Sequence, residues 1–350
     1  MKVLHVISSL GIGGAERLIS DMLPQMKATE VDVSLLVYRR LYNDFEKKLE
    51  DAGVNIISLE VKSNYNPRIV FSLVNAIKGF DVIHVHLFPA LYQVALANTF
   101  VHKRLIYTEH STTNKRRNKI VFRNLERIVY EKYSSIVSVS NDVQKSLMRW
   151  LNIHDHRFIV IRNGIDLKSY IIPPQKGDYP VNLLMISRFV PAKDQETVIR
   201  AMQWTDKKTH VVFVGDGETR KSCEELARKI GVAERCHFEG TQSDIPYYIS
   251  KADVGILSSH WEGFGLTAVE MMAGELPVVA SDVEGLRQVI GGAGVLFKEG
   301  DDHELANNIN KLIDNKEYYD SIVSLCQKRA CLYDIRSTVS EYVKLYSDFL

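Results

Sequence analysis

The fold is decided where the chain begins: residues 2–7 read KVLHVI and residues 8–14 read SSLGIGG. The first run is apolar and rich in β-branched side chains, which favours a buried strand. The glycine-rich turn leads into residues 15–26, where apolar side chains recur at the spacing of a helix. A strand, a tight turn and a helix in this order are typical of the first unit of a parallel sheet that helices cover.

The same alternation continues along the chain and is interrupted once. Further short apolar runs predict strands at residues 31–37, 55–59, 82–85, 105–107, 136–139 and 158–161, and then at 181–186, 209–214, 236–238, 254–257 and 278–280. Between the two series, residues 171–180 contain three prolines and a glycine, which is typical of a linker. Continuous apolar strands joined by helices predict parallel sheets with both faces covered. The sequence therefore predicts an α/β fold of two Rossmann-like, doubly wound domains.

The same pattern sets the expected domain boundaries. Residues 1–170 form an N-terminal domain, residues 171–332 a C-terminal domain, and residues 333–350 a final amphipathic helix that is expected to pack back on the N-terminal domain. Open α/β domains bind ligands at the carboxyl ends of their strands. We expect the two domains to face each other across a cleft, which suits a reaction that joins two substrates.

The composition is that of an ordinary globular protein. Of the 350 residues, 45% are apolar and 25% are charged, and the length suffices for two hydrophobic cores. No segment reaches the apolar length of a membrane span, and the apolar start of the chain is too short for a signal peptide. The four cysteines lack C-x-x-C spacing. We therefore expect a reduced, cytoplasmic protein.

Charge is divided unevenly between the halves of the chain. Residues 1–170 hold 24 Lys and Arg against 16 Asp and Glu, and residues 171–350 hold 20 against 27. Arg116, Arg117 and Lys119 lie in the densest basic run, next to a predicted amphipathic helix. Such a segment can contact an anionic membrane or a lipid diphosphate acceptor, or it is simply solvated surface. A nucleic-acid partner is not expected, because the run is short and the net charge is only +1.

Two groups of residues are candidates for binding a diphosphate. Gly13 and Gly14 let backbone N–H groups approach a phosphate at the start of a helix; the alternative is a purely structural turn. Arg188 and Lys193 follow a predicted strand and can neutralise a departing diphosphate; the alternative is a solvated loop. Neither glycine-rich turn of the chain has the spacing of a dinucleotide fingerprint or a P-loop.

The most specific motif follows one of the C-terminal strands. Glu262 and Glu270 lie eight positions apart, the first in a glycine-rich loop and the second in a predicted helix. One carboxylate can accept hydrogen bonds from sugar hydroxyls and the other from a ribose diol. The N–H groups of Phe264, Gly265 and Leu266 open the helix toward a phosphate. Because that helix is apolar nearly all round, a carboxylate inside it is costly unless it binds something; the alternative is a surface group.

Histidines follow two predicted strands of the N-terminal domain. His110 comes shortly after the strand at 105–107 and is either an active-site group or a structural residue. His84 and His86 alternate with Val85, so the two histidines share one face of the sheet and Val85 points to the other. Because no cysteine or carboxylate cluster accompanies them, a metal site is not expected, and a structural or acceptor-binding role is favoured.

Together these motifs resemble the GT-B glycosyltransferases of glycosyltransferase family 4, and the resemblance covers nearly the whole chain. It rests on Gly13 to Arg17, Asn163 to Asp166, Ile186 to Arg188 with Lys193, Phe213 to Glu218, and the Glu262–Glu270 pair, which matches the family's E-x7-E signature. The resemblance implies a retaining sugar transfer without a metal or other cofactor. It implies that the two glycines lie near the diphosphate, the two cations on its phosphates, Glu262 on the donor sugar and Glu270 on the ribose. On a shorter motif, it also implies His110 near the reacting carbon.

The resemblance and the chemistry together predict a function. We expect a sugar to pass from a nucleoside-diphosphate sugar, with UDP the commoner choice in resembling enzymes, to a glycan or lipid-linked acceptor in polysaccharide or cell-envelope synthesis. The C-terminal domain is expected to bind the donor and the N-terminal domain the acceptor, in the cytoplasm or on the inner face of the membrane. Glu262 is expected to position the sugar rather than attack it. The alternatives are a nucleotide-sugar epimerase of the same architecture and a catalytically silent nucleotide-sugar binding protein.

Overall fold

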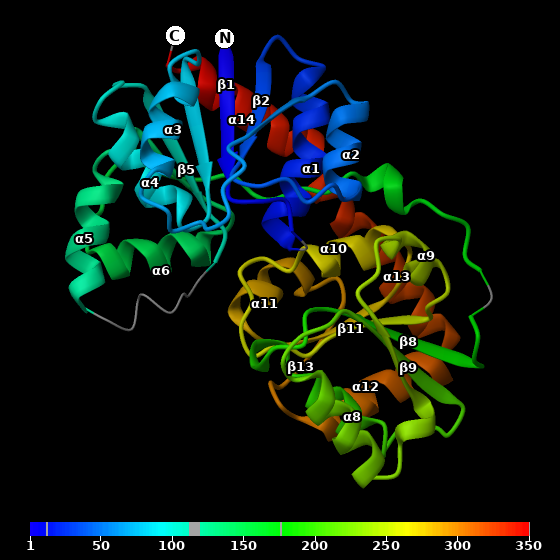
Figure 1. Cartoon of the computed structure of the whole chain (residues 1–350). Helices are drawn as coiled ribbons and strands as arrows, with labels where there is room; N and C mark the ends of the chain where they lie inside the picture. Colours follow the sequence, from blue (N-terminus) through cyan, green and yellow to red (C-terminus); the bar gives the residue numbers. More distant parts are fainter. Residues whose placement is uncertain (12, 112–119, 176, 350) are drawn as a thin grey trace. The chain divides into compact units, whose positions relative to one another are not determined.

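The chain divides into two compact units, residues 1–164 with 335–350 and residues 165–334 (Figure 1). The computed structural model describes residues 1–11, 13–111, 120–175 and 177–349, of which 120 and 121 are described by backbone alone. The first boundary lies six residues before the predicted one, because Ile165 pairs within the second unit. Its N–H donates to the carbonyl oxygen of Tyr333 at 2.9 Å, and a parallel bridge joins it to Asp334. The proline-rich stretch 171–180 therefore lies inside unit 2 and not between the units.

Unit 1 is built on a parallel sheet whose seven strands, among the described residues, run in the order β3-β2-β1-β4-β5-β6-β7. The strands are β1 (Lys2–Ile7), β2 (Asp32–Val37), β3 (Asn55–Ser58), β4 (Val82–His86), β5 (Arg104–Glu109), β6 (Ser135–Ser138) and β7 (Phe158–Val160). The helices are α1 (Gly14–Lys27), α2 (Asp44–Asp51), α3 (Ile69–Ile77), α4 (Ala90–Asn98), α5 (Ile120–Tyr130), α6 (Asn141–Leu151) and α14 (Ile335–Ser347). The strand order reverses between β1 and β4, which is where folds of this class bind ligands.

Each face of the unit 1 sheet has its own apolar layer, because successive side chains of a strand point to opposite faces. Leu4 and Val6 of β1 pack in the layer that α3, α4, α5 and α6 cover. Val3 and Ile7 pack in the layer that α1, α2 and α14 cover. The final helix thus belongs to unit 1, and its buried residues recur at helical spacing from Ile335 to Tyr346.

Unit 2 contains a second parallel sheet, with six strands among the described residues in the order β10-β9-β8-β11-β12-β13. The strands are β8 (Val181–Ile186), β9 (Thr209–Val214), β10 (Cys236–Gly240), β11 (Val254–Leu257), β12 (Val278–Ser281) and β13 (Val295–Phe297). The helices are α7 (Gln195–Ala201), α8 (Arg220–Lys229), α9 (Ile245–Ser250), α10 (Leu266–Ala273), α11 (Glu284–Ile290), α12 (Asp302–Asp314) and α13 (Lys316–Ala330). The sequence pattern did not predict β13, α11 or α13. β13 has only three residues, and in α13 only Ile322, Cys326 and Ala330 are buried.

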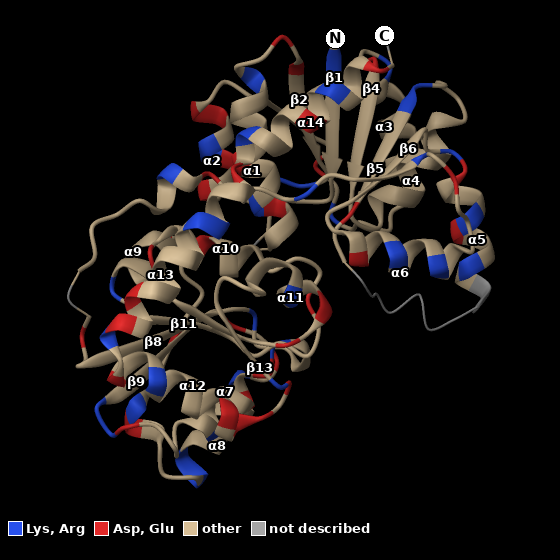
Figure 2. Cartoon of the chain, turned by 180° about the vertical axis from the view of Figure 1, so that it is seen from behind, with Lys and Arg blue, Asp and Glu red and all other residues tan. Residues whose placement is uncertain are grey.

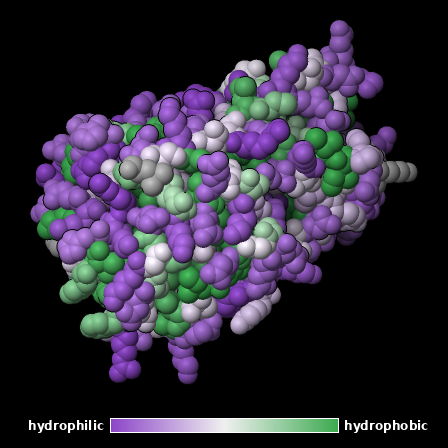
Figure 3. All heavy atoms as spheres, turned by 90° about the horizontal axis from the view of Figure 1, so that it is seen from above, coloured by the Kyte–Doolittle hydropathy of each residue, from purple (hydrophilic) through white to green (hydrophobic). Residues whose placement is uncertain are grey.

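Among the described residues, no helix combines the length and the apolar character that crossing a membrane requires. Both basic and acidic residues occur along each unit, so the charge difference between the halves of the chain is a net excess within a mixture of both signs (Figure 2). On the face shown in Figure 3, hydrophilic side chains predominate and hydrophobic ones form separate groups among them.

Candidate active site

Two loops of unit 2 meet where its strand order reverses. β8 and β11 are neighbours in the sheet, and each carboxyl end leads into one of the loops. The hydroxyl of Ser258 contacts the carbonyl oxygens of Lys193 (3.0 Å) and Asp194 (2.7 Å). The N–H of His260 donates to the carbonyl oxygen of Ala192 at 2.9 Å. Because parallel strands present their carboxyl ends at one edge of the sheet, residues far apart in the sequence become neighbours here.

The structure brings Lys193 and Glu262 into direct contact across these loops. The Lys193 ammonium donates a hydrogen bond to a carboxylate oxygen of Glu262, and the two side chains are 21% and 19% exposed. The other carboxylate oxygen accepts the N–H of Gly263 at 3.2 Å. An entering phosphate oxygen can take over the ammonium, which leaves Glu262 to accept hydrogen bonds from sugar hydroxyls. The sequence predicted both residues but not their pairing.

Arg188 lies in the same loop as Lys193, and a turn that contains Gly215 packs against the backbone of this loop. The side chain of Arg188 is exposed and makes no hydrogen bond or ion pair with the rest of the described chain. The N–H of Phe189 donates to the carbonyl oxygen of Asp216 at 2.9 Å. Gly215 has a φ of +136°, and a Cβ there would overlap the carbonyl oxygen of Ser187. Only glycine therefore lets this turn lie directly against the backbone that carries Arg188.

The glutamate pair is divided between a loop and a helix, as the spacing predicted. Gly265 has a φ of +84° and precedes α10, which begins at Leu266. Phe264 is 3% exposed and meets the Tyr333 ring edge-on at a centroid distance of 5.3 Å. Glu270 lies inside α10 and is 2% exposed. Phe264 thus anchors the helix start, where backbone N–H groups favour an anion.

In unit 1, the glycine turn after β1 forms the start of α1. Gly13 precedes the helix in an extended conformation, and α1 begins at Gly14. The N–H of Arg17 donates to the carbonyl oxygen of Gly13 at 3.0 Å, which closes the first helical turn. The turn lies at the carboxyl end of β1, next to β4, at the switch point of this sheet, which is the place where the strand order reverses. Gly13 and Gly14 therefore stand where a ligand of unit 1 is expected.

His110 follows β5 and contacts a second histidine. Its Nε2 lies 3.2 Å from Nδ1 of His86, while its Nδ1 is buried and has no partner among the described residues. Desolvation by burial lowers the pKa of His110 to about 4, so the ring is neutral near pH 7. A neutral imidazole with one nitrogen unpartnered can hydrogen-bond to a substrate oxygen.

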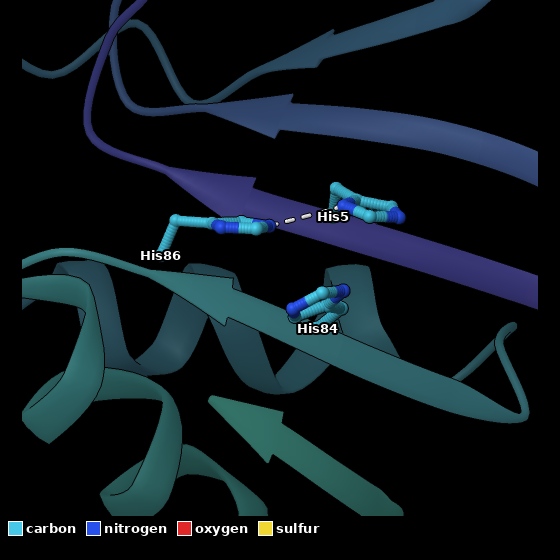
Figure 4. A group of neighbouring side chains, drawn as sticks. All are labelled: His5, His84 and His86. Carbon is cyan, nitrogen blue, oxygen red and sulfur yellow. Dashed lines mark hydrogen bonds between the residues drawn. The ribbon is translucent and has the colours of Figure 1, made fainter. Parts of the chain in front are cut away.

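Three histidines of β1 and β4 gather on the sheet face that α14 covers. His5, His84 and His86 are completely buried, and Figure 4 shows their rings side by side (Figure 4). Nitrogen atoms of the three lie within 4.8 Å of one another, a spacing that is compatible with a metal ion. Each of the six ring nitrogens, however, is already within hydrogen-bond distance of another histidine, a tyrosine or a threonine. We therefore interpret the group as a hydrogen-bonded network. The sequence pattern pointed to His84 and His86 but missed His5, whose strand precedes β4 by more than seventy residues.

The predicted basic surface is the one candidate that cannot be placed. Arg116, Arg117 and Lys119 lie outside the described residues. The neighbouring helix α5 is described from residue 122 onward with its side chains, and there Leu125 and Ile128 are 45% and 59% exposed, with Arg127 exposed between them.

Comparisons with known proteins agree with this architecture. A family model described as Glycosyltransferase Family 4 matches residues 12–169, and one described as Glycosyl transferases group 1 matches residues 173–328. The chain is similar to "Uncharacterized glycosyltransferase MJ1178" of Methanocaldococcus jannaschii, with 28% identity over 87% of this chain and 86% of that protein.

Two further similarities extend the comparison to a named activity and to a solved fold. The chain is similar to "Phosphatidyl-myo-inositol mannosyltransferase" of Mycobacterium leprae, with 26% identity over 76% of this chain and 73% of that protein. Among solved structures, HepE of Anabaena in complex with UDP and glucose covers 99% of this chain and 100% of its own, with a TM-score of 0.88 and 21% identity. At that identity the match to HepE concerns the fold.

Proposed function

The chain belongs to glycosyltransferase family 4, whose members have the GT-B fold, and on this premise we propose that it is a retaining transferase that uses a UDP-sugar. The observation that carries the proposal is the Lys193–Glu262 pair between the loops of β8 and β11. A cation and a carboxylate held together at the switch point match a substrate that has an anionic diphosphate and a hydroxyl-rich sugar. The UDP and glucose bound to HepE support uridine as the base.

The proposed reaction needs no metal, because the two cations of the loop take its place. The bond between the anomeric carbon and the diphosphate oxygen breaks, and its electron pair stays on the diphosphate. Arg188 and Lys193 stabilise this charge as it develops. The acceptor oxygen bonds to the carbon on the face that the diphosphate leaves, and the acceptor's proton passes to a diphosphate oxygen. Glu262, released from Lys193, positions the sugar and stabilises its developing positive charge.

We propose a glycan or lipid-linked molecule as the acceptor, bound by unit 1. The named activity of the mannosyltransferase relative supports a lipid-linked acceptor. The test is to incubate the chain with a panel of nucleotide sugars and to follow the release of nucleoside diphosphate with and without acceptors. Release that an acceptor accelerates, with the anomeric configuration kept, supports the proposal. An epimer of the donor as the product, inversion, or binding without turnover would each refute it.

Glu270→Gln is expected to weaken the binding of UDP and of the UDP-sugar by about tenfold to a hundredfold, the usual worth of a hydrogen bond to a charged group. The buried carboxylate of α10 is proposed to accept the ribose hydroxyls, and the amide keeps its shape but loses its charge. Isothermal calorimetry measures the change. The matched control is Glu275→Gln, an exposed carboxylate just beyond the same helix. Equal affinities for the wild type and Glu270→Gln would contradict the assigned role.

We further propose that α5 and the basic run before it touch the inner face of the membrane. Exposed Leu125, Arg127 and Ile128 combine apolar and basic character, as interfacial helices do. The protein is expected to sediment with vesicles that contain anionic phosphatidylserine and to release from them when salt rises from 0.1 to 0.5 M. Substituting Arg116, Arg117 and Lys119 by Gln should abolish this sedimentation, whereas binding to purely zwitterionic vesicles that salt leaves unchanged would contradict the proposal.

A further inference from the structure

The candidate active-site residue His110 stands at one end of an unbroken chain of buried hydrogen bonds. The contacts, in order from that end, are His110 Nε2 to His86 Nδ1 (3.2 Å), His86 Nε2 to His5 Nδ1 (3.1 Å), His5 Nε2 to Tyr346 Oη (3.2 Å), Tyr346 Oη to His84 Nδ1 (2.6 Å), His84 Nε2 to Thr108 Oγ1 (2.7 Å), and Thr108 Oγ1 to Tyr342 Oη (3.1 Å). Six contacts thus link seven side chains. We call these seven residues the relay.

The relay depends on one sheet face and one helix. β1, β4 and β5 are neighbouring strands, and His5, His84, His86 and Thr108 share the face that α14 covers. From α14, Tyr342 and Tyr346 point at this face from positions four apart, which are adjacent on a helix. All members except His110 are completely buried. Bulk water therefore does not compete for the hydrogen bonds between these six side chains.

The hydrogens of the relay can be counted. Burial lowers the pKa of His5 to about 3, and it lowers those of His84 and His86 well below their usual value, so the rings are neutral near pH 7. A neutral imidazole, a phenol and a threonine hydroxyl each carry one exchangeable hydrogen. Seven hydrogens and six hydrogen bonds leave one hydrogen over. Each ring that donates at one nitrogen must accept at the other. Tyr346 and Thr108 lie inside the relay and could each accept from both neighbours, but their own hydrogen would then be buried with no acceptor among the described residues. The spare hydrogen therefore sits at an end of the relay.

The two ends differ in what they offer this spare hydrogen. At one end Tyr342 is completely buried, and Thr108 is the sole hydrogen-bond partner of its hydroxyl in the described structure. A hydroxyl that donated nothing there would stay unsatisfied in every state of the protein. At the other end, His110 Nδ1 lies at the carboxyl edge of the sheet, where ligands of this fold bind. A ligand oxygen can satisfy the spare hydrogen only at this end.

We propose that Tyr342 and Tyr346 fix His110 in the tautomer that carries its hydrogen on Nδ1, so that His110 donates a hydrogen bond to a substrate oxygen and does not act as a base. Tyr342 then donates to Thr108, Thr108 to His84, His84 to Tyr346, and the direction is passed on through His5 and His86. The ligand class is an oxygen with a free lone pair, in a sugar hydroxyl or a phosphate. Tyr342 and Tyr346 are positioning residues. The inference rests on the proposed function for the identity of this ligand, whereas the tautomer itself does not depend on it.

The tautomer is measured directly by NMR of the full chain with ¹⁵N-labelled histidine, because protonated and unprotonated ring nitrogens differ widely in chemical shift. The His110 signals are assigned as those absent from His110→Gln. The wild type is expected to carry hydrogen on Nδ1 alone. Tyr346→Phe separates His110, His86 and His5 from the hydroxyl groups of the relay. The spare hydrogen of these three rings can then lie either on His110 Nδ1 or on His5 Nε2. A mixture of both His110 tautomers is the expected result.

The matched control is Tyr133→Phe. Tyr133 is 1% exposed, its hydroxyl donates to the Leu91 carbonyl oxygen at 2.6 Å, and it packs on the other face of the sheet. This variant loses one buried hydroxyl and should keep the wild-type tautomer. A wild-type His110 protonated on Nε2 would overturn the proposal, as would a Tyr346→Phe variant with an unchanged tautomer. The wild-type spectrum alone can refute it, even if Tyr346→Phe fails to fold.

Kinetics provide a second measurement. In Tyr346→Phe, only the fraction of His110 that still carries hydrogen on Nδ1 can donate to the substrate. The kcat for sugar transfer is therefore expected to fall by this fraction, about twofold for equal populations of the two tautomers, with little change in KM for the nucleotide sugar. Tyr133→Phe should keep both constants. A protein that transfers no sugar from any donor would refute the proposed function and leave the spectroscopic result standing, so the two failures are distinguishable. An unchanged kcat together with mixed tautomers would refute the donor role of His110.

Discussion

Replacing Lys193 by alanine is expected to lower kcat about a hundredfold to a thousandfold. This is the usual cost of removing one group that stabilises developing charge in a transition state. The substitution also leaves Glu262 unpaired beside the place where the diphosphate gathers charge, since the two side chains contact each other directly. A steady-state assay of nucleoside diphosphate release, at saturating donor, measures the effect.

The fold should survive this substitution, because a partly exposed ion pair contributes only about 0–1 kcal/mol to stability. The matched control is Lys251→Ala, which removes an ammonium that pairs with Asp178 at 3.0 Å elsewhere in unit 2. Turnover in that variant should equal the wild-type value. If Lys193→Ala kept more than a tenth of wild-type kcat, Lys193 would not be the principal clamp on the leaving group.

Unit 1 is expected to lose most of its stability between pH 7 and pH 5. Burial lowers the pKa values of His5, His84, His86 and His110 below their usual value of 6.5. The unfolded chain therefore binds protons in this range that the folded chain does not, and the free energy of unfolding falls as pH drops below 6.5. Each histidine contributes about 1.4 kcal/mol per pH unit, and the four together remove roughly 6–8 kcal/mol.

A loss of this size is comparable with the whole stability of a domain, about 5–15 kcal/mol. Urea unfolding at pH 7, 6 and 5 measures it, and the slope between pH 6 and pH 5 should correspond to the uptake of nearly four protons. Tyr133→Phe is the control, because its hydroxyl does not titrate in this range and its effect should be equal at all three pH values. A midpoint that does not move between pH 7 and pH 5 would mean that the four rings are not held neutral by the fold.

Much of the fold could be predicted from the sequence because buried parallel strands are continuous apolar runs. β1, β8, β9 and β11 begin and end where the pattern placed them. β13 was missed because three residues give no periodicity, and α13 because only one narrow stripe of it is buried. The boundary between the units was misplaced by six residues. Proline content marks where the chain cannot form regular structure, whereas the backbone pairing of Ile165 decides to which unit a segment belongs.

The sequence by itself determined which residue types follow which strands: two glycines, a histidine, two cations and two glutamates, the last of them inside the next helix. That information is local, because a strand, its turn and the following helix lie within about twenty residues. Only the tertiary structure decided that Lys193 pairs with Glu262 and that His5 and the tyrosines of α14 join His84, His86 and His110 in one relay. These contacts depend on strand order and on how a helix from the end of the chain lies on a sheet that begins with its first residues. Neither the order of the strands nor the position of that helix produces a periodic pattern in the sequence.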